Sequence, residues 1–242
     1  MIIGIIPWRR VFAAQQQRLR RILHPSRMGT LRRTQPLSDV WGFDRGTPVD
    51  RRYIEQFLHT YRGVITGRVL EVQDSRYTER FGTAVLQRDV LDIDPANARA
   101  TWIADLAAAD TIPSSLFDCI ILTQTLHLIY DTQAALAHVY RMLQPGGTAL
   151  VTLPAVSRVS RGVGVDGDYW RFTVASARRL FGTVFGAQHV DVRSYGNVLT
   201  AMAFLTGMAA EELRTHEIQA HDPFFPVIVG IKATKPLDYV QE

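Results

Sequence analysis

Three carboxylates stand near the ends of predicted strands, and their chemistry suits the binding of a polar ligand. Glu71 lies near the end of one such strand, and Asp94 and Asp105 directly follow two others. In open parallel sheets, ligands bind at the edge formed by the carboxyl ends of the strands. A carboxylate there offers two acceptor oxygens to neighbouring donors such as hydroxyl groups. The pattern predicts a ligand site at one sheet edge, although each acid also suits an ordinary strand-end turn.

His127 is a candidate proton acceptor at the same edge. It follows a predicted strand through the sequence Thr-Gln-Thr-Leu, residues 123–126. An imidazole titrates near neutral pH and can take a proton from a hydroxyl group. The same side chain can instead pack as a helix histidine, and both interpretations stay open.

The stretch 117–154 supplies the elements that position these residues. The apolar run 119–122 predicts a buried strand of a parallel sheet. Apolar residues recur at steps of three and four over 132–143, which predicts a helix. Pro-Gly-Gly at 145–147 is expected to end that helix, and 148–153 is expected to form the next strand. Together they predict a strand–helix–strand unit with a right-handed crossover.

Two motifs in this stretch, FDxIxxxxxLxxxxD and LxPGGxxLVTxP, resemble the second half of class I S-adenosylmethionine-dependent methyltransferases. The resemblance runs from about Gly67 to Pro154. It implies an α/β fold with a Rossmann-like, doubly wound, mostly parallel sheet, closed by an antiparallel C-terminal edge hairpin. The strands of that hairpin are expected at 189–194 and 227–233. The resemblance also implies S-adenosyl-L-methionine as the cofactor.

The resemblance assigns roles to several residues of the edge. Asp94, with Asp92 in reserve, is expected to accept hydrogen bonds from the two ribose hydroxyls of the cofactor. Asp105 is expected to take the adenine amino group, and the backbone amide of Leu106 to contact the ring. Gln124 is expected to run along the cofactor. Asp105 follows Asp94 by only 11 positions, so the helix between these strands should be very short or absent.

The loop after the first strand departs from the family pattern ExGxGxG. Glu71, which the resemblance implies is a cofactor-binding residue, is followed by Val-Gln-Asp-Ser-Arg-Tyr, which contains no glycine. Either Gln73, Asp74 and Ser75 re-form the cofactor pocket, with Asp74 also capping the helix that starts near Tyr77, or the site is blocked. The loop is similar to that of a type 11-like bacterial branch of the family, found alongside glycosyltransferases of surface polysaccharide synthesis. The segments GFDRGTP and DYWRFT resemble that branch as well.

Two further segments are expected to contact the acceptor. Residues 41–58 predict a turn followed by a helix, and the resemblance implies a lid carrying Arg45 and Asp50. The alternative is a local ion pair with helix capping.

The second segment is the long loop 155–175, which contains Tyr169, Trp170 and Arg171. Aromatic faces beside a cation suit sugar rings or their phosphates. The alternative is that Trp170 only docks the following helix, 175–180, for which Thr173 is the expected cap.

Composition favours one soluble domain with an appended arm. The 242 residues are 47% hydrophobic, the formal charge is +4, and 25 of the 27 basic residues are arginine. The single cysteine, Cys119, fits a reducing compartment, so a cytoplasmic location is expected. The scattered histidines give no sign of a metal site. No nucleic-acid binding is expected, because 123–126 lacks an Asn-Pro-Pro-Tyr-like motif.

Residues 1–36 carry eight arginines and no acid, and 12–23 predict a basic amphipathic helix. This arm is expected either to touch an acidic membrane surface as a peripheral contact or to be a solvated tail. The methyltransferase-like domain is expected over 37–242.

The sequence therefore favours a methyltransferase that O-methylates a sugar or glycan-linked acceptor. The competing interpretation is a non-catalytic partner or regulatory subunit of a polysaccharide-building enzyme, such as a glycosyltransferase.

Overall fold

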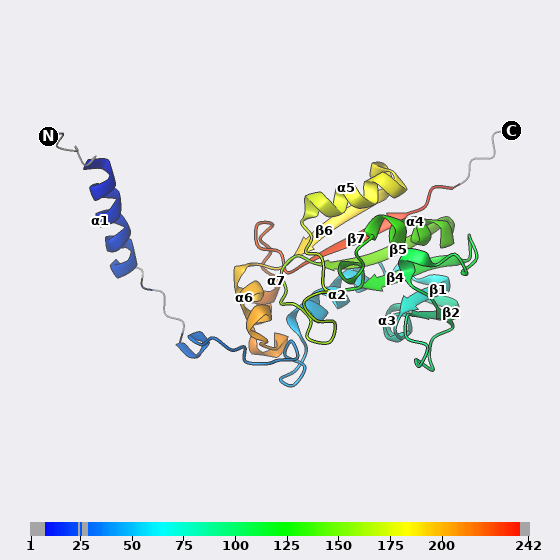
Figure 1. Cartoon of the computed structure of the whole chain (residues 1–242), viewed down its shortest axis with the longest axis horizontal. Helices are drawn as coiled ribbons and strands as arrows, with labels where there is room; N and C mark the ends of the chain where they lie inside the picture. The colour runs from blue at the N-terminus through cyan, green and yellow to red at the C-terminus, as the bar shows by residue number, and fades with distance from the viewer. Residues whose placement is uncertain (1–7, 24, 26–28, 238–242) are drawn as a thin grey trace. The chain divides into compact units, whose positions relative to one another are not determined.

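Seven strands form one sheet in the order β3-β2-β1-β4-β5-β7-β6 (Figure 1). Strands β1 to β5 pair in parallel, and β7 runs antiparallel to both β5 and β6. The predicted Rossmann-like sheet with its antiparallel edge hairpin is thus confirmed. The strand bounds are Thr66–Val72 for β1, Ala84–Asp92 for β2, Trp102–Ile103 for β3, Phe117–Thr123 for β4, Leu143–Pro154 for β5, Val190–Tyr195 for β6 and Ile228–Thr234 for β7.

The computed structural model describes residues 8–23, 25 and 29–237, and it divides into a unit of residues 1–36 and a unit of residues 37–242. Among the helices of these described residues, none combines the length and apolar character that crossing a bilayer requires. The first unit contains α1, Trp8–Leu23. The second contains α2 Val49–Thr60, α3 Arg76–Phe81, α4 Thr132–Met142, α5 Val174–Phe185, α6 Val198–Thr206 and α7 Thr215–Gln219.

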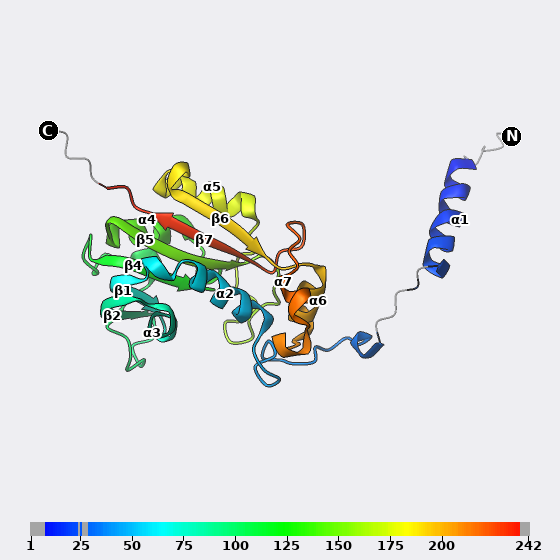
Figure 2. The same cartoon turned by 180° about the vertical axis from the view of Figure 1, so that it is seen from behind.

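The central strand β4 is buried on both faces, as its unbroken apolar run predicts. Ile120 and Leu122 pack with α4 and α5 on one face, whereas Cys119 and Ile121 pack with α2 and α6 on the other. Figures 1 and 2 show these two helical layers from opposite sides. The sheet edge that carries the predicted site residues is therefore held between two packed layers.

The link from α4 to β5 differs from the expected glycine turn. Helix α4 ends at Met142, but β5 already begins at Leu143 and includes Pro145, Gly146 and Gly147. A Cβ at Gly147 would lie 2.9 Å from the carbonyl oxygen of Gln144, so a side chain there would clash with the backbone. The glycines therefore do not form a separate turn. They allow the irregular first part of β5 to pass close to β4.

Local signals elsewhere are confirmed. Residues 93–101 form turns without a helix, as the short spacing between β2 and β3 predicts. Thr173 caps α5 through a reciprocal hydrogen-bond pair with Ser176. Antiparallel pairing of β6 and β7 completes the edge.

Glu71 fixes the turn from β1 into α3. Its buried carboxylate accepts hydrogen bonds from the amides of Tyr77 and Thr78, at 3.0 and 2.8 Å, and from the Thr78 hydroxyl at 2.8 Å. Asp74 bonds only the first helical amide, that of Arg76. The expected cap by Asp74 is thus met in part, because Glu71 takes the amides that follow.

The role of Glu71 in the turn is tested by the effect of its replacement on the stability of the folded chain. Glu71→Ala leaves two buried helix amides without acceptors, and we expect it to lower the free energy of unfolding by about 3 kcal/mol. Urea unfolding followed by circular dichroism measures this change. Glu79→Ala on the exposed side of α3 is the matched control and should change it by less than about 0.5 kcal/mol. Equal effects of the two variants would contradict the assigned role of Glu71.

Candidate active site

A cavity of about 170 Å³ lies at the carboxyl end of β4. Four segments that are far apart in the sequence surround it: the stretch before α2, the first turn of α2, the residues after β4, and the long loop after β5. Phe204 of α6 closes one side. Three residues singled out from the sequence meet here, namely Asp50, Gln124 and His127. The fold therefore joins one expected acceptor contact, one expected cofactor contact and the expected base.

Four buried polar atoms of this cavity have no hydrogen-bond partner among the described residues. They are Asp50 Oδ1, Gln124 Nε2, His127 Nδ1 and Arg158 Nε. Leaving one such group unpaired costs about 1–3 kcal/mol, so folded proteins rarely gather several in one place without a use. The set contains an acceptor in Asp50 and donors in Gln124 and Arg158. It suits a ligand that itself carries both donors and acceptors, such as a polyhydroxy compound.

Asp50 is the buried acid of the cavity. It lies in the first turn of α2 with an exposed fraction of 7%. Burial raises the pKa of its carboxyl above the usual value, and the neighbouring charge of Arg51 opposes this shift. A carboxylate in this state has an increased affinity for a proton released by a bound hydroxyl group.

Burial also shifts the pKa of His127, but in the opposite direction. Burial lowers the pKa of its imidazole to about 4, while the charge of Asp168 opposes the shift and those of Arg171 and Arg51 add to it. The ring is therefore neutral near pH 7 and binds a proton weakly. Its free Nδ1 suits a hydrogen bond to a ligand better than the removal of a proton.

A left-handed turn directs Gln124 into the cavity. Its backbone φ is +50°, and its amide donates to the carbonyl of Thr152 at 2.9 Å. This conformation is uncommon outside glycine and often marks a functional position. It turns the chain sharply after β4 so that Gln124 and His127 line the same space.

The two loops beside the cavity hold each other. The guanidinium of Arg158 lies 4.0 Å from the ring centroid of Trp41, and Arg158 also donates to the carbonyl of Asp39. Arg161 pairs with the Asp39 carboxylate at 2.7 Å. Sequence reasoning missed Trp41 and Arg158, and the only available signal was the arginine-rich character of the long loop.

Arg45 lies away from the cavity lining. Its guanidinium pairs with Glu212 through Nε at 3.0 Å and through Nη2 at 2.5 Å. The hydrogen bond to Glu212, together with its charge, raises the pKa of Arg45, and the hydrogen bond from Arg45 lowers the pKa of the Glu212 carboxyl. Arg45 thus fastens the lid segment 37–48 to the stretch after α6 through a long-range ion pair, which differs from the local ion pair of the alternative interpretation.

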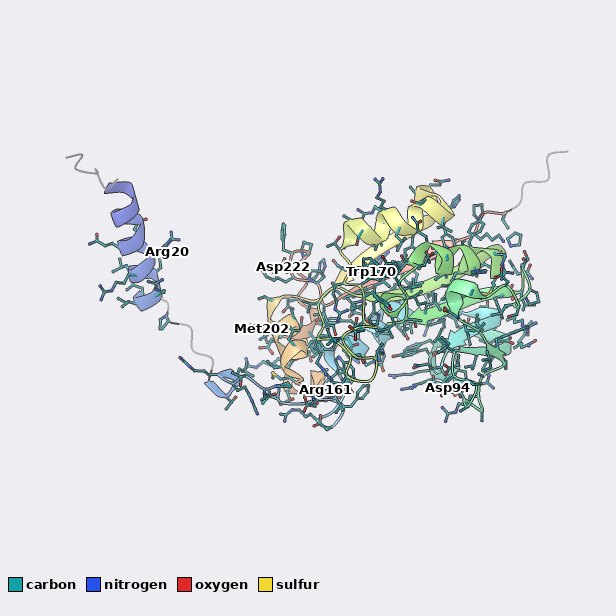
Figure 3. All side chains as sticks on the ribbon, in the orientation of Figure 1. Arg20, Asp94, Arg161, Trp170, Met202 and Asp222 are labelled. Carbon is teal, nitrogen blue, oxygen red and sulfur yellow. The ribbon has the colours of Figure 1, made fainter. Side chains whose placement is uncertain are left out.

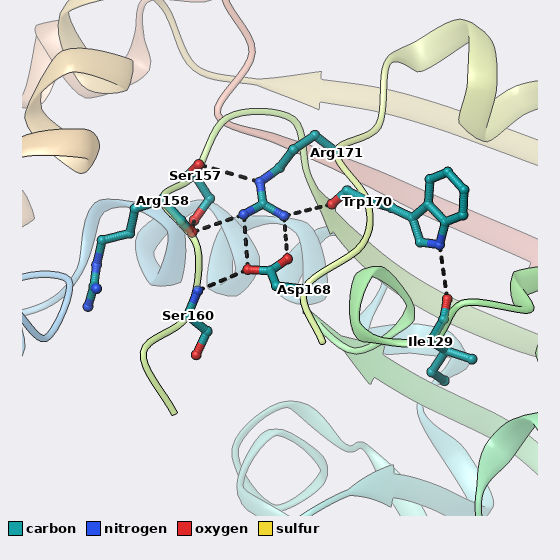
Figure 4. A network of polar contacts seen from close by, with 7 residues as sticks. All are labelled: Ile129, Ser157, Arg158, Ser160, Asp168, Trp170 and Arg171. Atoms are coloured by element: carbon teal, nitrogen blue, oxygen red, sulfur yellow. Dashed lines mark hydrogen bonds and ion pairs between the residues drawn. The ribbon is translucent and has the colours of Figure 1, made fainter. Parts of the chain in front are cut away.

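Arg171 holds the long loop in shape (Figure 4). It forms a two-point pair with the buried carboxylate of Asp168, at 2.5 and 3.0 Å. It also donates to the carbonyls of Ser157, Arg158 and Trp170, at 3.4, 3.0 and 2.8 Å. The guanidinium donors are therefore used within the loop, and an acceptor contact by Arg171 stays a prediction.

Tyr169 and Trp170 form an exposed aromatic cluster with Tyr130. The ring of Tyr130 stacks on Trp170 at 5.9 Å and meets Tyr169 edge-on at 5.4 Å. Trp170 also donates its indole N–H to the carbonyl of Ile129 (Figure 4). The amides of Tyr169 and Trp170 both donate to the carbonyl of His127, so this cluster is anchored directly beside the cavity.

The acids at the ends of β2 and β3 differ in whether their carboxylate oxygens already accept hydrogen bonds. Asp92 is used internally, since one oxygen accepts from the Asp94 amide at 3.0 Å and the other from Asn97 Nδ2 at 2.6 Å. Asp94 and Asp105 are exposed, and each has one oxygen bonded to a nearby amide, that of Ala96 or Ala107. Their second oxygens have no partner among the described residues and fit the hydroxyl and amino donors of an adenosyl group.

The altered loop keeps the backbone conformation that glycine would give. Gln73 has φ of +70°, its amide donates to the carbonyl of Leu91 at 2.9 Å, and its own carbonyl accepts from Asn97 at 2.8 Å. The Gln73 side chain is exposed, and Asp74 pairs with Arg76 at 2.5 Å.

Leu106, beyond β3, is buried in the core. In the described part of the chain, no group of three metal-ligating side chains gathers.

Residues 67–151 match the family model described as "Methyltransferase domain", which spans β1 to most of β5. This match supports a methyltransferase in general and S-adenosylmethionine as the cofactor. Curated proteins offer no match to this chain.

Solved structures share the fold at low sequence identity. An S-adenosylmethionine-dependent methyltransferase from Archaeoglobus fulgidus gives a TM-score of 0.51 at 12% identity, covering 76% of this chain and 94% of that one. The [4+2]-cyclase SpnF gives 0.51 at 17% identity, covering 85% and 88%. A methyltransferase in complex with the Haloferax volcanii activator Trm112 gives 0.50 at 15% identity, covering 84% and 100%. Because one of these proteins is a cyclase, the fold alone does not fix the reaction.

The pKa of His127 predicts how stability changes with pH. In the unfolded chain the ordinary histidine pKa is about 6.5, whereas in the folded chain it is about 4. As the pH falls from 7 to 5, the unfolded state gains a proton that the folded state does not, so stability falls by about 2 kcal/mol. His127→Asn should lose this share of the pH dependence in urea unfolding, and His216→Asn at an exposed position should keep it. A histidine signal of His127 titrating near 6.5 in the folded protein would contradict the prediction.

Proposed function

We propose that this chain is an S-adenosylmethionine-dependent methyltransferase that O-methylates a sugar or glycan-linked acceptor. The observation that carries the proposal is the cavity at the end of β4, where the unpaired polar atoms of Asp50, Gln124, His127 and Arg158 converge. Such a set is suited to orienting one hydroxyl among several on the same molecule.

Asp94 and Asp105 would hold the adenosyl part of the cofactor through their free carboxylate oxygens, with the backbone at Leu106 beside the ring. Gln124 would hold the end nearer the cavity. The cofactor supplies a methyl carbon activated by a sulfonium, so the transfer depends mainly on alignment with the acceptor oxygen. Gln73 and Asp74 would stand in for the missing glycine loop, whereas Glu71 is used by α3 and would act only by fixing that loop.

The acceptor hydroxyl must lose its proton as the new carbon–oxygen bond forms. Burial strengthens Asp50 as a proton acceptor and weakens His127, so we assign the proton to the Asp50 carboxylate. His127, neutral near pH 7, would orient the hydroxyl through Nδ1. This assignment refines the expectation from the sequence, which placed the base at His127.

The exposed aromatic cluster supports a sugar as the acceptor. Tyr130, Tyr169 and Trp170 present ring faces beside the cavity, with exposed fractions of 70%, 47% and 38%. Aromatic rings provide flat apolar surfaces with low conformational entropy, which pack against the C–H faces of sugar rings. The polar cavity and this aromatic surface together suit a glycan that extends outward from its reacting residue.

The loop without glycine favours a second candidate, a non-catalytic partner or regulatory subunit of a polysaccharide-building enzyme such as a glycosyltransferase. The two candidates differ in whether the cofactor binds. Cofactor binding by the intact chain is therefore the decisive measurement.

Calorimetry with S-adenosylhomocysteine should show micromolar binding to the wild-type chain. Asp94→Asn and Asp105→Asn each remove a charged acceptor, and we expect each to weaken binding by about 10-fold or more. Asp110→Asn, an exposed acid beyond β3, is the matched control and should bind as the wild type does. No binding at millimolar ligand would sink the enzymatic proposal and support the non-catalytic candidate.

Methyl transfer to a panel of methyl glycosides and sugar nucleotides should depend on Asp50. We expect Asp50→Asn to lower kcat by roughly 100-fold or more with cofactor affinity unchanged, because the proton acceptor is lost. His127→Asn should have a smaller effect, and Asp44→Asn on the lid segment should have none. A larger loss for His127→Asn than for Asp50→Asn would return the role of base to His127.

A further inference from the structure

The arm that precedes the domain has charge of one sign only. Residues 1–36 contain eight arginines and no acid. In α1, Arg18, Arg20 and Arg21 are exposed, and no acidic residue lies in its first turn. Figure 3 shows the side chain of Arg20 on this helix. Whatever binds this helix through its charges must carry negative charge.

The same helix exposes an apolar face. Leu19, Ile22 and Leu23 have exposed fractions of 58%, 63% and 64%. Their spacing of three and four residues places them on one side of the helix, away from Arg21. A partner that binds both faces of the helix therefore has an apolar region next to its negative charge.

The domain carries a second exposed apolar surface at the place where the arm joins it. Val198, Met202 and Leu205 form a stripe on α6 with exposed fractions of 47%, 47% and 43%. We call this stripe the α6 ridge. Phe224, in the loop before β7, is 87% exposed and shares a surface hollow with Ala201 of α6.

Chain continuity connects the arm to this ridge. The domain begins at Leu37, whose amide donates to the carbonyl of Thr206 at 2.7 Å, at the C-terminal end of α6. The first residue of the domain therefore lies beside the ridge. Residues 24–36 link α1 to this point of the domain.

We propose that α1 and the α6 ridge bind the surface of an anionic lipid bilayer. Lipid headgroups supply the negative charge that the arginines require, and the acyl boundary below them takes up apolar side chains at shallow depth. Nucleic acid supplies the charge without a continuous apolar layer, so it would leave Leu19, Ile22 and Leu23 unused. The inference is independent of whether the chain transfers methyl groups.

Co-sedimentation of the full chain with phosphatidylcholine vesicles, with and without phosphatidylglycerol, tests the proposal. We expect binding to the anionic vesicles only, weakened by added salt. Arg20→Gln/Arg21→Gln should bind about 30-fold more weakly, since each arginine near the surface contributes about 1 kcal/mol. Arg178→Gln/Arg179→Gln makes the same charge change on exposed positions of α5 and should bind as the wild type does.

Two further variants separate membrane insertion from charge alone. Leu19→Ser/Ile22→Ser should reduce binding by about 10-fold or more, and Met202→Ser/Leu205→Ser severalfold, with thermal melting of the domain unchanged. Wild-type binding by the Leu19/Ile22 variant would overturn the proposal, as would equal binding to neutral vesicles or binding to a random oligonucleotide in place of vesicles. Wild-type binding by the Met202/Leu205 variant would overturn the part assigned to the ridge.

Discussion

The parallel pairing of β1, β4 and β5 is the constraint on which the site depends. Parallel strands bring their carboxyl ends to one edge, and helices on both faces keep that edge in place. Gln124 leaves β4 at this edge, and the loop that carries Arg158 leaves β5 beside it. The first turn of α2 brings Asp50 to the same place from a segment that precedes the sheet. The position of the cavity therefore follows from the direction of the strands. Its polar residues come from the loops and from the first turn of α2.

Burial gives the two titratable groups of the cavity opposite roles. Desolvation disfavours the charged form of each group, so it raises the proton affinity of Asp50 and lowers that of His127. An aspartate that would ordinarily be a poor base becomes a better one, and a histidine that would ordinarily be partly charged becomes a neutral hydrogen-bonding group. Trp41 of the lid segment and Arg158 of the long loop pack together and line the same cavity, so both segments contribute to enclosing Asp50 and His127.

Local patterns predicted most of the fold, because they reflect local physics. The apolar run of β4, the three-and-four spacing of α4 and the cap at Thr173 each concern residues that are close in sequence. The site was predicted only in part, because its contacts are long-range. Arg45 pairs with Glu212, 167 positions away, and no local signal distinguishes that ion pair from a ligand contact. Glu71 resembles a cofactor residue in the sequence, and only the folded turn reveals its bonds to α3.

The loss of glycine from the loop after β1 does not by itself remove the site. Glycine serves two purposes in such a loop: it permits positive φ, and it leaves space for a ligand. Here Gln73 keeps the positive φ, because its amide and carbonyl are held by Leu91 and Asn97, and these bonds offset a strain of order 1 kcal/mol. The backbone course is therefore retained without glycine. What changes is the side chain that the loop carries at this position, and the side chain of Gln73 is exposed. Asp94 and Asp105 lie exposed at the same edge, and each has one oxygen without a partner among the described residues, so the altered loop does not cover them.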